Sequence, residues 1–328
     1  MIGAQTIRMA VIGCGRWGPN HARVIDENPK TELAACVDSD PARRSAMIAR
    51  FGVPCPEDTR QLSEMNGIDA VVVATPVETH FSVVTEMLDQ GYHVLCEKPL
   101  SSDVHTCIEM GLHAQEAGKI LMVGHIFLFN DGIRTLAEIV QSGHLGDILY
   151  VEANRTNLGP VRTDVGAAAD LATHDISILN FIFGKAADYA GAVTRLCSPN
   201  SEHEDVVFAI MRYGDVVTSI HASWAEPIKT RTIKVVGSRR TVVWDDLSIQ
   251  HPITIYDRGS EPSTPDDFIS FKLARHDGGI HMPTVEHREP LATQLSEFVA
   301  CIGSGEKPLS DAVFAASVAS TLQAIEGR

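Results

Sequence analysis

Hydrophobic and polar positions in the first part of the chain switch repeatedly between two patterns. Short apolar runs rich in β-branched residues predict strands at residues 7–13, 31–38, 69–75, 93–98 and 119–126. Amphipathic segments between them predict helices at residues 20–28, 40–52, 79–91 and 103–118. Alternation of strand and helix is typical of a parallel sheet with crossover helices. We therefore expect an N-terminal, doubly wound α/β domain over residues 1–124.

Beyond residue 124 strands follow one another without helices between them. Two helices are predicted at residues 130–146 and 167–184, and two more at 291–305 and 310–327. Strands are predicted at residues 147–156, 187–196, 204–213, 215–224, 230–237, 240–246 and 249–257. This pattern indicates a second, α+β domain over residues 125–328, with a large, mostly antiparallel open sheet.

Helices can cover one face of that second sheet. Alternating strands such as "VVTSIHASW" indicate that the other face also carries apolar side chains. An uncovered apolar face of this size is typical of a subunit interface. We therefore expect a homodimer or homotetramer formed through this sheet.

Composition excludes several classes of protein. The chain has 328 residues, enough for two cores, and a net charge of −15, which disfavours binding to nucleic acid. No window reaches the roughly 18 uncharged apolar residues of a membrane span, and the N-terminus does not resemble a signal peptide. The seven cysteines form no CxxC pair. They indicate reduced thiols in the cytoplasm, and no metal site is predicted.

A glycine-rich loop lies where the first strand passes into the first helix. Its sequence, "GCGRWG", places glycines at Gly13, Gly15 and Gly18, and Asp38 ends the second strand 20 residues later. This spacing is typical of dinucleotide binding, with backbone amides on the pyrophosphate and the carboxylate on the adenosine ribose. The expected cofactor contacts in and beside the loop also include Arg16, Trp17 and Ser39. The alternative is a glycine turn with an aspartate placed by chance.

The acidic ribose position bears on the choice of cofactor. Asp38 would repel a 2′-phosphate, so we expect NAD rather than NADP. Arg43 and Arg44 in the next helix could instead hold that phosphate, although we expect them to be solvated surface charges.

Candidate chemistry follows at the ends of two later strands, at the sheet edge where doubly wound folds bind ligands. Thr75 and Pro76 would lie along the nicotinamide ribose, and His80 would cap either the site or the next helix. Glu97 and Lys98 end the fourth strand, and a lysine there can stabilise an alkoxide as hydride leaves. The alternative for Lys98 is an ordinary surface lysine.

The segment "DLATHDISIL" places three ionisable residues in an apolar run. Asp170 and His174 are four residues apart and so share one face of a helix, whereas Asp175 lies one step, roughly 100°, away. We expect the apolar residues to anchor the helix in a core, and Asp175 to bond nearby backbone or a basic side chain. His174 is suited to act as a general base, with Asp170 orienting it or binding a neighbouring hydroxyl.

Taken in order, GxGxxG, Asp38, "TPVETH", "EKP" and "DLATHD" resemble the motif set of the Gfo/Idh/MocA oxidoreductase family. The resemblance covers essentially the whole chain. It implies a Rossmann domain, an α/β domain with an open sheet, and an active site between them that oxidises or reduces hydroxyls of sugars and cyclitols. The family's catalytic lysine, aspartate and histidine correspond to Lys98, Asp170 and His174.

Further stretches, "GHIFLFN" and "EANRTNLGPVRTDV", resemble the branch of nucleotide-sugar 3-dehydrogenases that act on UDP-N-acetylglucosamine or its uronate. Arg155 and Arg162 would then bind phosphate or carboxylate, and Asn157 a hydroxyl or acetamido group. A solvated polar loop is the alternative. Thr173 and Asp131 depart from the pattern of this branch. These departures leave Asp170 and His174 in place but concern the residues expected to form the sugar pocket.

The resulting expectation is oxidation of a ring hydroxyl at C3 of a nucleotide sugar. Alternatives are a 3-ketosugar reductase, a dehydrogenase of free or phosphorylated sugars or inositols, and a non-catalytic NAD-binding sensor.

Overall fold

The structure, a computed structural model, describes residues 6–327 except 66, 160–164, 198–202 and 258–277. The chain forms two compact units. Unit 1 comprises Met1–Phe129 and Arg288–Ala319, and unit 2 comprises Asn130–His287 and Ser320–Arg328.

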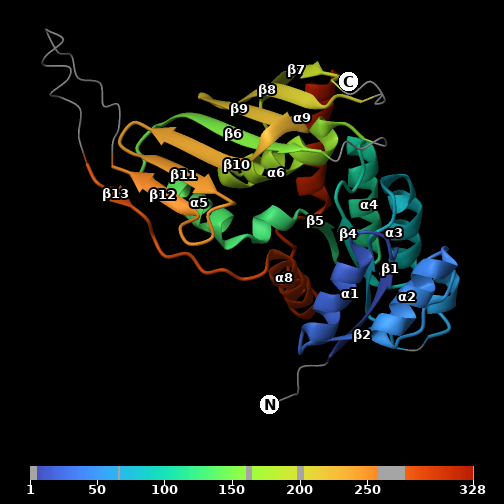
Figure 1. Cartoon of the computed structure of the whole chain (residues 1–328). Coiled ribbons are helices and arrows are strands. Elements are labelled where there is room, and N and C mark those ends of the chain that lie inside the picture. Colours follow the sequence, from blue (N-terminus) through green and yellow to red (C-terminus); the bar gives the residue numbers. More distant parts are fainter. Residues whose placement is uncertain (1–5, 66, 160–164, 198–202, 258–277, 328) are drawn as a thin grey trace, which may run out of the picture. The chain divides into compact units, whose positions relative to one another are not determined.

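Unit 1 contains a five-stranded parallel sheet with the order β2-β1-β3-β4-β5 (Figure 1). Its strands are β1 (Ile7–Ile12), β2 (Thr31–Val37), β3 (Ala70–Val73), β4 (His93–Glu97) and β5 (Leu121–Gly124). The connecting helices are α1 (Gly18–Glu27), α2 (Pro41–Phe51), α3 (His80–Asp89) and α4 (Val104–Glu116). The predicted alternation of strands and helices is confirmed.

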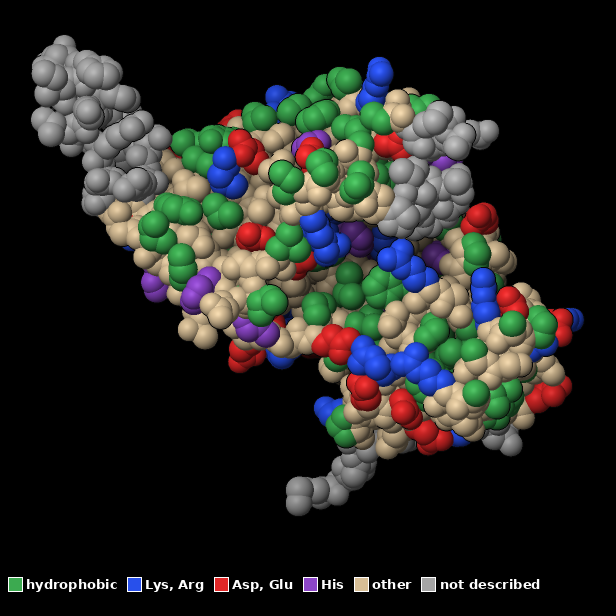
Figure 2. Space-filling model, viewed as in Figure 1, with side chains coloured by type: hydrophobic (Ala, Val, Ile, Leu, Met, Phe, Trp, Pro, Cys, Tyr) green, Lys and Arg blue, Asp and Glu red, His purple; other side chains and the backbone are tan. Residues whose placement is uncertain are grey.

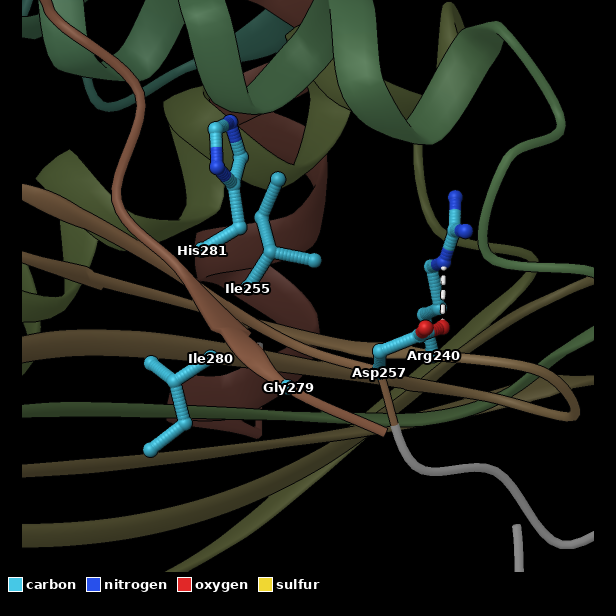
Figure 3. A pocket seen from close by; sticks show the side chains of 6 residues that line it. All are labelled: Arg240, Ile255, Asp257, Gly279, Ile280 and His281. Carbon is cyan, nitrogen blue, oxygen red and sulfur yellow. Dashed lines mark hydrogen bonds and ion pairs between the residues drawn. The ribbon is translucent and has the colours of Figure 1, made fainter. Parts of the chain in front are cut away.

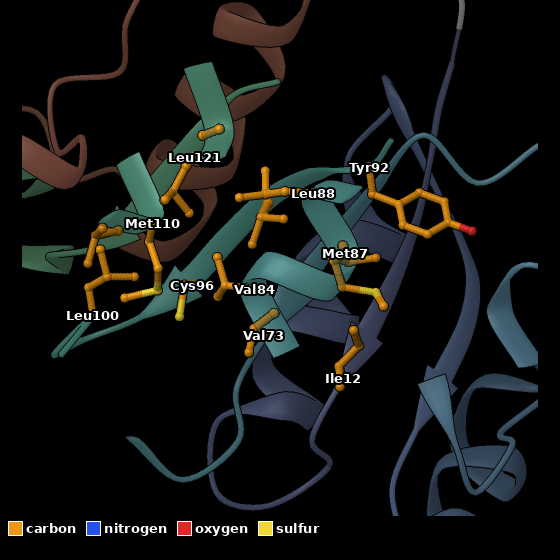
Figure 4. Packing of buried hydrophobic residues seen from close by; sticks show 14 of the residues in the cluster. Ile12, Val73, Val84, Met87, Leu88, Tyr92, Cys96, Leu100, Met110 and Leu121 are labelled. Carbon is orange, nitrogen blue, oxygen red and sulfur yellow. The ribbon is translucent and has the colours of Figure 1, made fainter. Parts of the chain in front are cut away.

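The core of unit 1 explains why its strands are continuous apolar runs. All four residues of β3, Ala70 to Val73, are 0% exposed, as expected for a strand with both faces covered. Figure 4 shows Ile12 and Val73 from the sheet, and Val84 and Met87 from α3, within one apolar cluster. Each Å² of apolar surface removed from water stabilises a fold by about 25 cal/mol. Burial of this cluster is therefore the main contribution to the stability of unit 1.

The C-terminal part of the chain also contributes to unit 1, which differs from the predicted division at residue 124. Helix α8 (Pro290–Ser304) packs against α1 and the short 3-10 helix η3 (Ile126–Phe129). After α8, the hydroxyl of Ser310 donates to the carbonyl of Val123 over 2.6 Å, and the amide of Val123 donates to the carbonyl of Ser310. These contacts span more than 180 residues of sequence. The local pattern of residues 288–319 carries no sign of them.

Unit 2 is built on an eight-stranded sheet with the order β13-β12-β11-β10-β6-β9-β8-β7 (Figure 1). Its strands are β6 (Ile148–Leu158), β7 (Tyr189–Arg195), β8 (Val206–Tyr213), β9 (Val216–Ser223), β10 (Ala225–Gly237), β11 (Thr241–Asp245), β12 (Ile253–Tyr256) and β13 (Ile280–His281). Among the described strands of this sheet only the β6–β9 pair is parallel, so the prediction of a mostly antiparallel sheet is confirmed. The two-residue β13 was not predicted, because so short a strand has no periodicity.

The two faces of this sheet differ in their cover. Helix α5 (Asp131–Gln141) packs on β11 and β12, and the turn η4 (Ala168–Ala172) before α6 (Thr173–Phe183) packs on β8 and β9. On that side β8 buries Val207, Ala209 and Met211, whereas its alternate residues Phe208 and Ile210 are exposed. Hydrophobic side chains are visible on the surface over β7 to β9 in Figure 2. Helix α9 (Ala312–Glu326) completes the chain, and none of the described helices is both long and apolar enough to cross a membrane.

Candidate active site

The glycine-rich loop of unit 1 contains glycines required for two different reasons. Gly13 has φ +93°, and a Cβ there would lie 2.7 Å from the carbonyl of Ala74, while a Cβ on Gly18 would lie 2.1 Å from the oxygen of Gly13. Both positions therefore need glycine to pack the loop against its own strands. A Cβ on Gly15 would meet only a guanidinium nitrogen of Arg43, at 3.8 Å. Packing within unit 1 does not require glycine there, which fits a position where the backbone approaches a bound pyrophosphate.

Asp38 is fixed beside this loop by backbone amides. Its carboxylate oxygens accept from the amides of Cys14, over 2.7 Å, and Asp40, over 2.8 Å, and the residue is 7% exposed. Each carboxylate oxygen has a second lone pair, so the group can still accept a ribose hydroxyl. The loop and the acid predicted from their spacing are thus joined directly by the Cys14–Asp38 hydrogen bond.

Of the two arginines that follow, Arg43 is exposed, as expected for a surface charge, whereas Arg44 is more buried than expected. Arg43 extends a guanidinium nitrogen to 3.7 Å from the Asp38 carboxylate and another to 3.6 Å from Asp40. Arg44 donates to the backbone carbonyls of Asp38 and Ser39. Arg43 is thus held between two carboxylates at the edge of the ribose position.

The end of β3 forms the next part of the site. Thr75 is half-buried and Pro76 exposed, and the hydroxyl of Thr79 donates to Thr75 Oγ1 over 2.8 Å. His80 is 2% exposed and opens α3, so it does not face solvent. Its Nε2 lies 3.0 Å from the carbonyl of Thr75 and its Nδ1 lies 2.9 Å from the carbonyl of Pro99. His80 thus links the ends of β3 and β4 rather than serving only as a helix cap.

The end of β4 carries Lys98 between two anchored neighbours. Glu97 accepts from or pairs with His21 Nε2 at 2.8 Å through one oxygen, and accepts from the Lys98 amide over 3.1 Å through the other. His21 lies on α1 with its side chain 2% exposed, and that of Glu97 is 15% exposed. Glu97 was predicted to contact the cofactor. Both of its carboxylate oxygens have hydrogen-bond partners within unit 1. Lys98 is half-buried at the carboxyl end of its strand, as predicted.

His125 was not predicted to belong to the site. Register pairs Glu97 with Gly124, so His125 follows β5 at the sheet edge where Lys98 follows β4. Among the described residues no hydrogen-bond partner is found for either ring nitrogen, and the ring of Phe314 meets it edge-on at 5.4 Å. Burial, and then the charge of Lys98, lower the pKa of His125 to about 3. It therefore lies beside the lysine as a neutral ring.

In unit 2 the helix containing Asp170 and His174 is not α-helical throughout. Ala168–Ala172 forms a π-helical turn, and α6 begins at Thr173. Asp170 and His174 are both partly exposed, whereas Thr173 and Asp175 on either side of His174 are buried. Single π-turns within helices are frequent at functional sites. The expected separation of Asp175 from the Asp170–His174 pair is confirmed.

Asp175 has a basic partner, which corrects one of the predicted substrate contacts. Arg155 on β6 donates from Nε and Nη2 to the two carboxylate oxygens of Asp175, over 2.9 and 2.8 Å. The two side chains are 2% and 1% exposed. Arg155 is thus committed to a buried bidentate pair that joins the sheet to α6, so we leave it out of the substrate site.

The remaining predicted substrate residues follow Arg155 in sequence. The side-chain amide of Asn157 donates to the carbonyl of Gly159 over 2.8 Å, which shapes the end of β6. Arg162 lies outside the described residues.

Unit 2 also contains a cavity of about 240 Å³ that none of these residues lines. It is lined by Arg240, Ile255, Asp257, Gly279, Ile280 and His281. Figure 3 shows the Arg240–Asp257 ion pair, 2.8 Å long, within it. The charges of Arg240 and Asp257 therefore compensate each other within the cavity. Elsewhere within the described ranges, no cluster of three histidine, cysteine or acidic side chains has the geometry of a metal site.

Sequence reasoning missed His21 and His125 and left the role of His80 open. Each had a signal: His21 lies three residues after Gly18 in the first helix, and His125 directly follows the fifth strand. A histidine in an otherwise apolar environment is more often a core residue than a functional one, so position alone could not select them.

Comparison with known proteins defines the class. The family model described as "Oxidoreductase family, NAD-binding Rossmann fold" matches residues 7–125, and the "GFO/IDH/MocA C-terminal domain" matches residues 133–243. This chain therefore belongs to the Gfo/Idh/MocA oxidoreductase family, as its motifs predicted. Its first domain is an NAD-binding Rossmann domain.

Individual relatives are distant. The chain is 25% identical over 224 residues to 2,7-anhydro-N-acetylneuraminate hydratase of Mediterraneibacter gnavus, covering 64% of this chain and 59% of that protein. It is 23% identical to the scyllo-inositol 2-dehydrogenase (NAD(+)) of Bacillus subtilis, covering 92% and 88%. It also resembles the structure of UDP-N-acetylglucosamine 3-dehydrogenase GnnA from Acidithiobacillus ferrooxidans, with a TM-score of 0.84, 24% identity and 98% of each chain covered. At this identity the likeness to the solved structure shows a shared fold.

Proposed function

We propose that this protein oxidises a secondary hydroxyl of a sugar ring with NAD, giving a keto sugar. The observation that carries the proposal lies in the helix of unit 2. Of the ionisable residues in "DLATHD", Asp170 and His174 remain partly exposed while Asp175 is buried against Arg155. A helix that buries most of its length but leaves an aspartate and a histidine accessible is suited to general-base chemistry.

Each candidate residue has a distinct role in this proposal. His174 takes the hydroxyl proton, since an imidazole is a suitable base near neutral pH. Asp170 orients the imidazole or binds an adjacent hydroxyl. Lys98, at the strand end in the NAD-binding domain, stabilises the negative charge that develops on the oxygen.

The dinucleotide loop and Asp38 would hold NAD in preference to NADP. Gly13, Gly15 and Gly18 would present backbone amides to the pyrophosphate, and Asp38 would accept from the ribose hydroxyls. Arg16, Trp17, Ser39 and Pro76 are exposed, and Thr75 is half-buried, so their side chains are accessible for further contacts. When bound, NAD supplies the hydride acceptor. The negative charge of Asp38, with that of Asp40 two residues later, opposes a 2′-phosphate at the same place.

The substrate we propose is a nucleotide sugar such as UDP-N-acetylglucosamine or its uronate, oxidised at C3. Support comes from the "GHIFLFN" and "EANRTNLGPVRTDV" stretches and from the names of the relatives, which concern polyhydroxylated rings. Asn157 and Arg162 remain in this proposal, while Arg155 does not. Reduction of a 3-keto sugar is the same chemistry in reverse and is the second candidate direction.

We further propose that unit 2 assembles into a homodimer or homotetramer through the uncovered sheet face. Val193, Phe208 and Ile210 on this face are 75%, 55% and 51% exposed. Such an apolar strip on neighbouring strands is typical of a protein interface. The seven cysteines, none of them disulfide-bonded, are consistent with the cytoplasm we propose as its location.

A substrate panel tests the activity. Purified protein with NAD, and separately with NADP, is offered UDP-sugars, free and phosphorylated sugars and inositols while NADH or NADPH absorbance is followed. We expect NAD-linked turnover of a UDP-sugar to exceed that of the free sugars. Turnover of inositols alone would move the assignment to another branch of the family. NAD binding without turnover of any compound, in either direction, would favour the non-catalytic sensor.

A further inference from the structure

Lys98 is bordered on each side by a residue that a buried histidine holds. Glu97 before it is bound by His21 from α1, and Pro99 after it is contacted through its carbonyl by His80 from α3. The two histidines are 1% and 2% exposed. They contact the turn formed by Glu97, Lys98 and Pro99, the lysine turn, from two different helices of unit 1.

The contact from α3 uses a specific ring nitrogen. His80 Nδ1 lies 2.9 Å from the carbonyl of Pro99 and 3.3 Å from that of Leu100, while Nε2 lies 3.0 Å from the carbonyl of Thr75. A carbonyl oxygen only accepts, so each close contact requires an N–H on the ring. A neutral ring donates on one side and an imidazolium on both. The Nδ1 side is the one that reaches the lysine turn.

The contact from α1 uses the other ring nitrogen. His21 Nε2 lies 2.8 Å from Glu97 Oε1, and Glu97 Oε2 accepts from the Lys98 amide over 3.1 Å. A Cβ on Gly124 would lie 3.2 Å from Glu97 Oε2, so the neighbouring strand leaves little space around this carboxylate. Glu97 is therefore confined between His21, Gly124 and the backbone of Lys98.

We propose that His21 and His80 are positioning residues that fix the Glu97–Lys98–Pro99 turn, and through it the ammonium group of Lys98. The importance of that group rests on the function proposed above. Misplacing a catalytic group by 1 Å can cost about 100-fold in rate, so two buried contacts on either side of the lysine have kinetic consequences. Neither histidine needs to touch substrate or cofactor to have this effect.

Amide isosteres provide a reciprocal test. The amide nitrogen of asparagine falls near the position of histidine Nδ1, and that of glutamine near Nε2. At position 80 the lysine-turn contact uses Nδ1, so His80→Asn should preserve it and His80→Gln should lose it. At position 21 the contact uses Nε2, so His21→Gln should preserve it and His21→Asn should lose it. A role in packing alone would favour the larger glutamine at both positions.

Two measurements are made on the full-length protein and the four variants, with His113→Gln on the surface of α4 as a control. Hydrogen–deuterium exchange of the segment 96–101 reports whether the turn is held, without any substrate. We expect faster exchange of this segment in His80→Gln and His21→Asn only. Turnover with the substrate found by the panel should fall about 10-fold or more in these two variants and less than about threefold in the isosteres. The NAD dissociation constant of His21→Asn should stay near that of the parent.

Equal exchange in all four variants would overturn the proposal, as would the same preferred substitution at both positions. Altered exchange with unchanged turnover would overturn the role in positioning Lys98. If the parent protein turns over nothing while the reciprocal exchange pattern is present, the proposed function fails and the anchoring of the turn stands.

Discussion

Arg155 and Asp175 form a bidentate ion pair, 2.8 and 2.9 Å long, with both side chains almost fully buried. The pair joins β6 of the sheet to the first turn of α6, one residue after His174. Because Asp175 directly follows His174, the ion pair also fixes the backbone that carries the histidine. The pair therefore stabilises the fold of unit 2 and orients the helix that carries the proposed base.

Removing one partner of this pair should be costly. Arg155→Met would leave the Asp175 carboxylate buried without its guanidinium, and such losses typically cost about 3–5 kcal/mol. The free energy of unfolding, measured in urea, checks this. A conservative exchange of both partners, Arg155→Met with Asp175→Leu, should recover much of the loss because no charge is left buried. If Arg155→Met instead kept its stability and only raised KM, Arg155 would be a substrate ligand after all.

Replacement of Asp38 tests the cofactor assignment. Asp38→Ala removes the acceptor for the ribose hydroxyls and should raise the dissociation constant of NAD by roughly 10-fold. This corresponds to a loss of about 1.4 kcal/mol, near the lower end of what a hydrogen bond to a charged group contributes. NADP should be affected less, because it does not profit from this carboxylate. Titration of both dinucleotides by calorimetry measures the two dissociation constants, with Arg43→Gln as the neighbouring control. A parent protein that already prefers NADP would contradict the assignment.

His125 should make stability depend on pH. Its pKa is lowered to about 3 in the folded protein, first by burial and then by Lys98, whereas an unfolded histidine titrates near 6.5. Below pH 6.5 the unfolded chain therefore binds a proton that the folded chain does not. The stabilisation is complete above about pH 6.5 and is lost by about 1.4 kcal/mol per pH unit as the pH falls toward 3.

The matched variant isolates this contribution. His125→Gln removes the titrating ring, so the difference in unfolding free energy between parent and variant should change by about 2 kcal/mol between pH 7 and pH 5. Urea unfolding at the two pH values measures it. Parallel pH profiles for the two proteins would show that His125 does not control the acid sensitivity.

The uncovered sheet face should hold subunits together. Phe208→Asp places a charge on a residue that is 55% exposed in the single chain, in the middle of the apolar strip on β7 and β8. Burial of an unpaired carboxylate in an interface is costly, so the oligomer should dissociate. Leu112→Asp is a suitable control, since Leu112 is 53% exposed on α4 in unit 1. Light scattering after gel filtration measures the mass, and an unchanged mass in Phe208→Asp would exclude this face.

Much of the fold could be predicted because its determinants are local. The buried strands of unit 1 are uninterrupted apolar runs, and the alternation in β8 marks one covered and one uncovered face. The glycine loop and Asp38 have a fixed spacing because they belong to one βαβ unit, and the Cys14–Asp38 hydrogen bond joins them. Helical periodicity likewise separated Asp175 from Asp170 and His174.

What could not be predicted depends on contacts distant in sequence. Nothing near Arg155 indicates that Asp175, 20 residues later, occupies its guanidinium. His80 reaches the carbonyl of Pro99 across 19 residues, and His21 reaches Glu97 across 76. The association of residues 288–319 with unit 1 arises in the same way, through partners such as Val123 and Ser310. Side-chain type identified Arg155, Glu97 and His80 as candidates, but tertiary packing decided their roles.

The most direct test of the proposed function is the His174→Asn variant, measured for NAD-linked turnover and for NAD binding side by side. Asparagine has similar bulk and polarity but cannot accept the hydroxyl proton as a base. We predict that turnover falls by about 100-fold or more, the usual contribution of a general base, while the NAD dissociation constant stays unchanged. Turnover equal to that of the parent protein would show that His174 is not the base and would contradict the proposed chemistry.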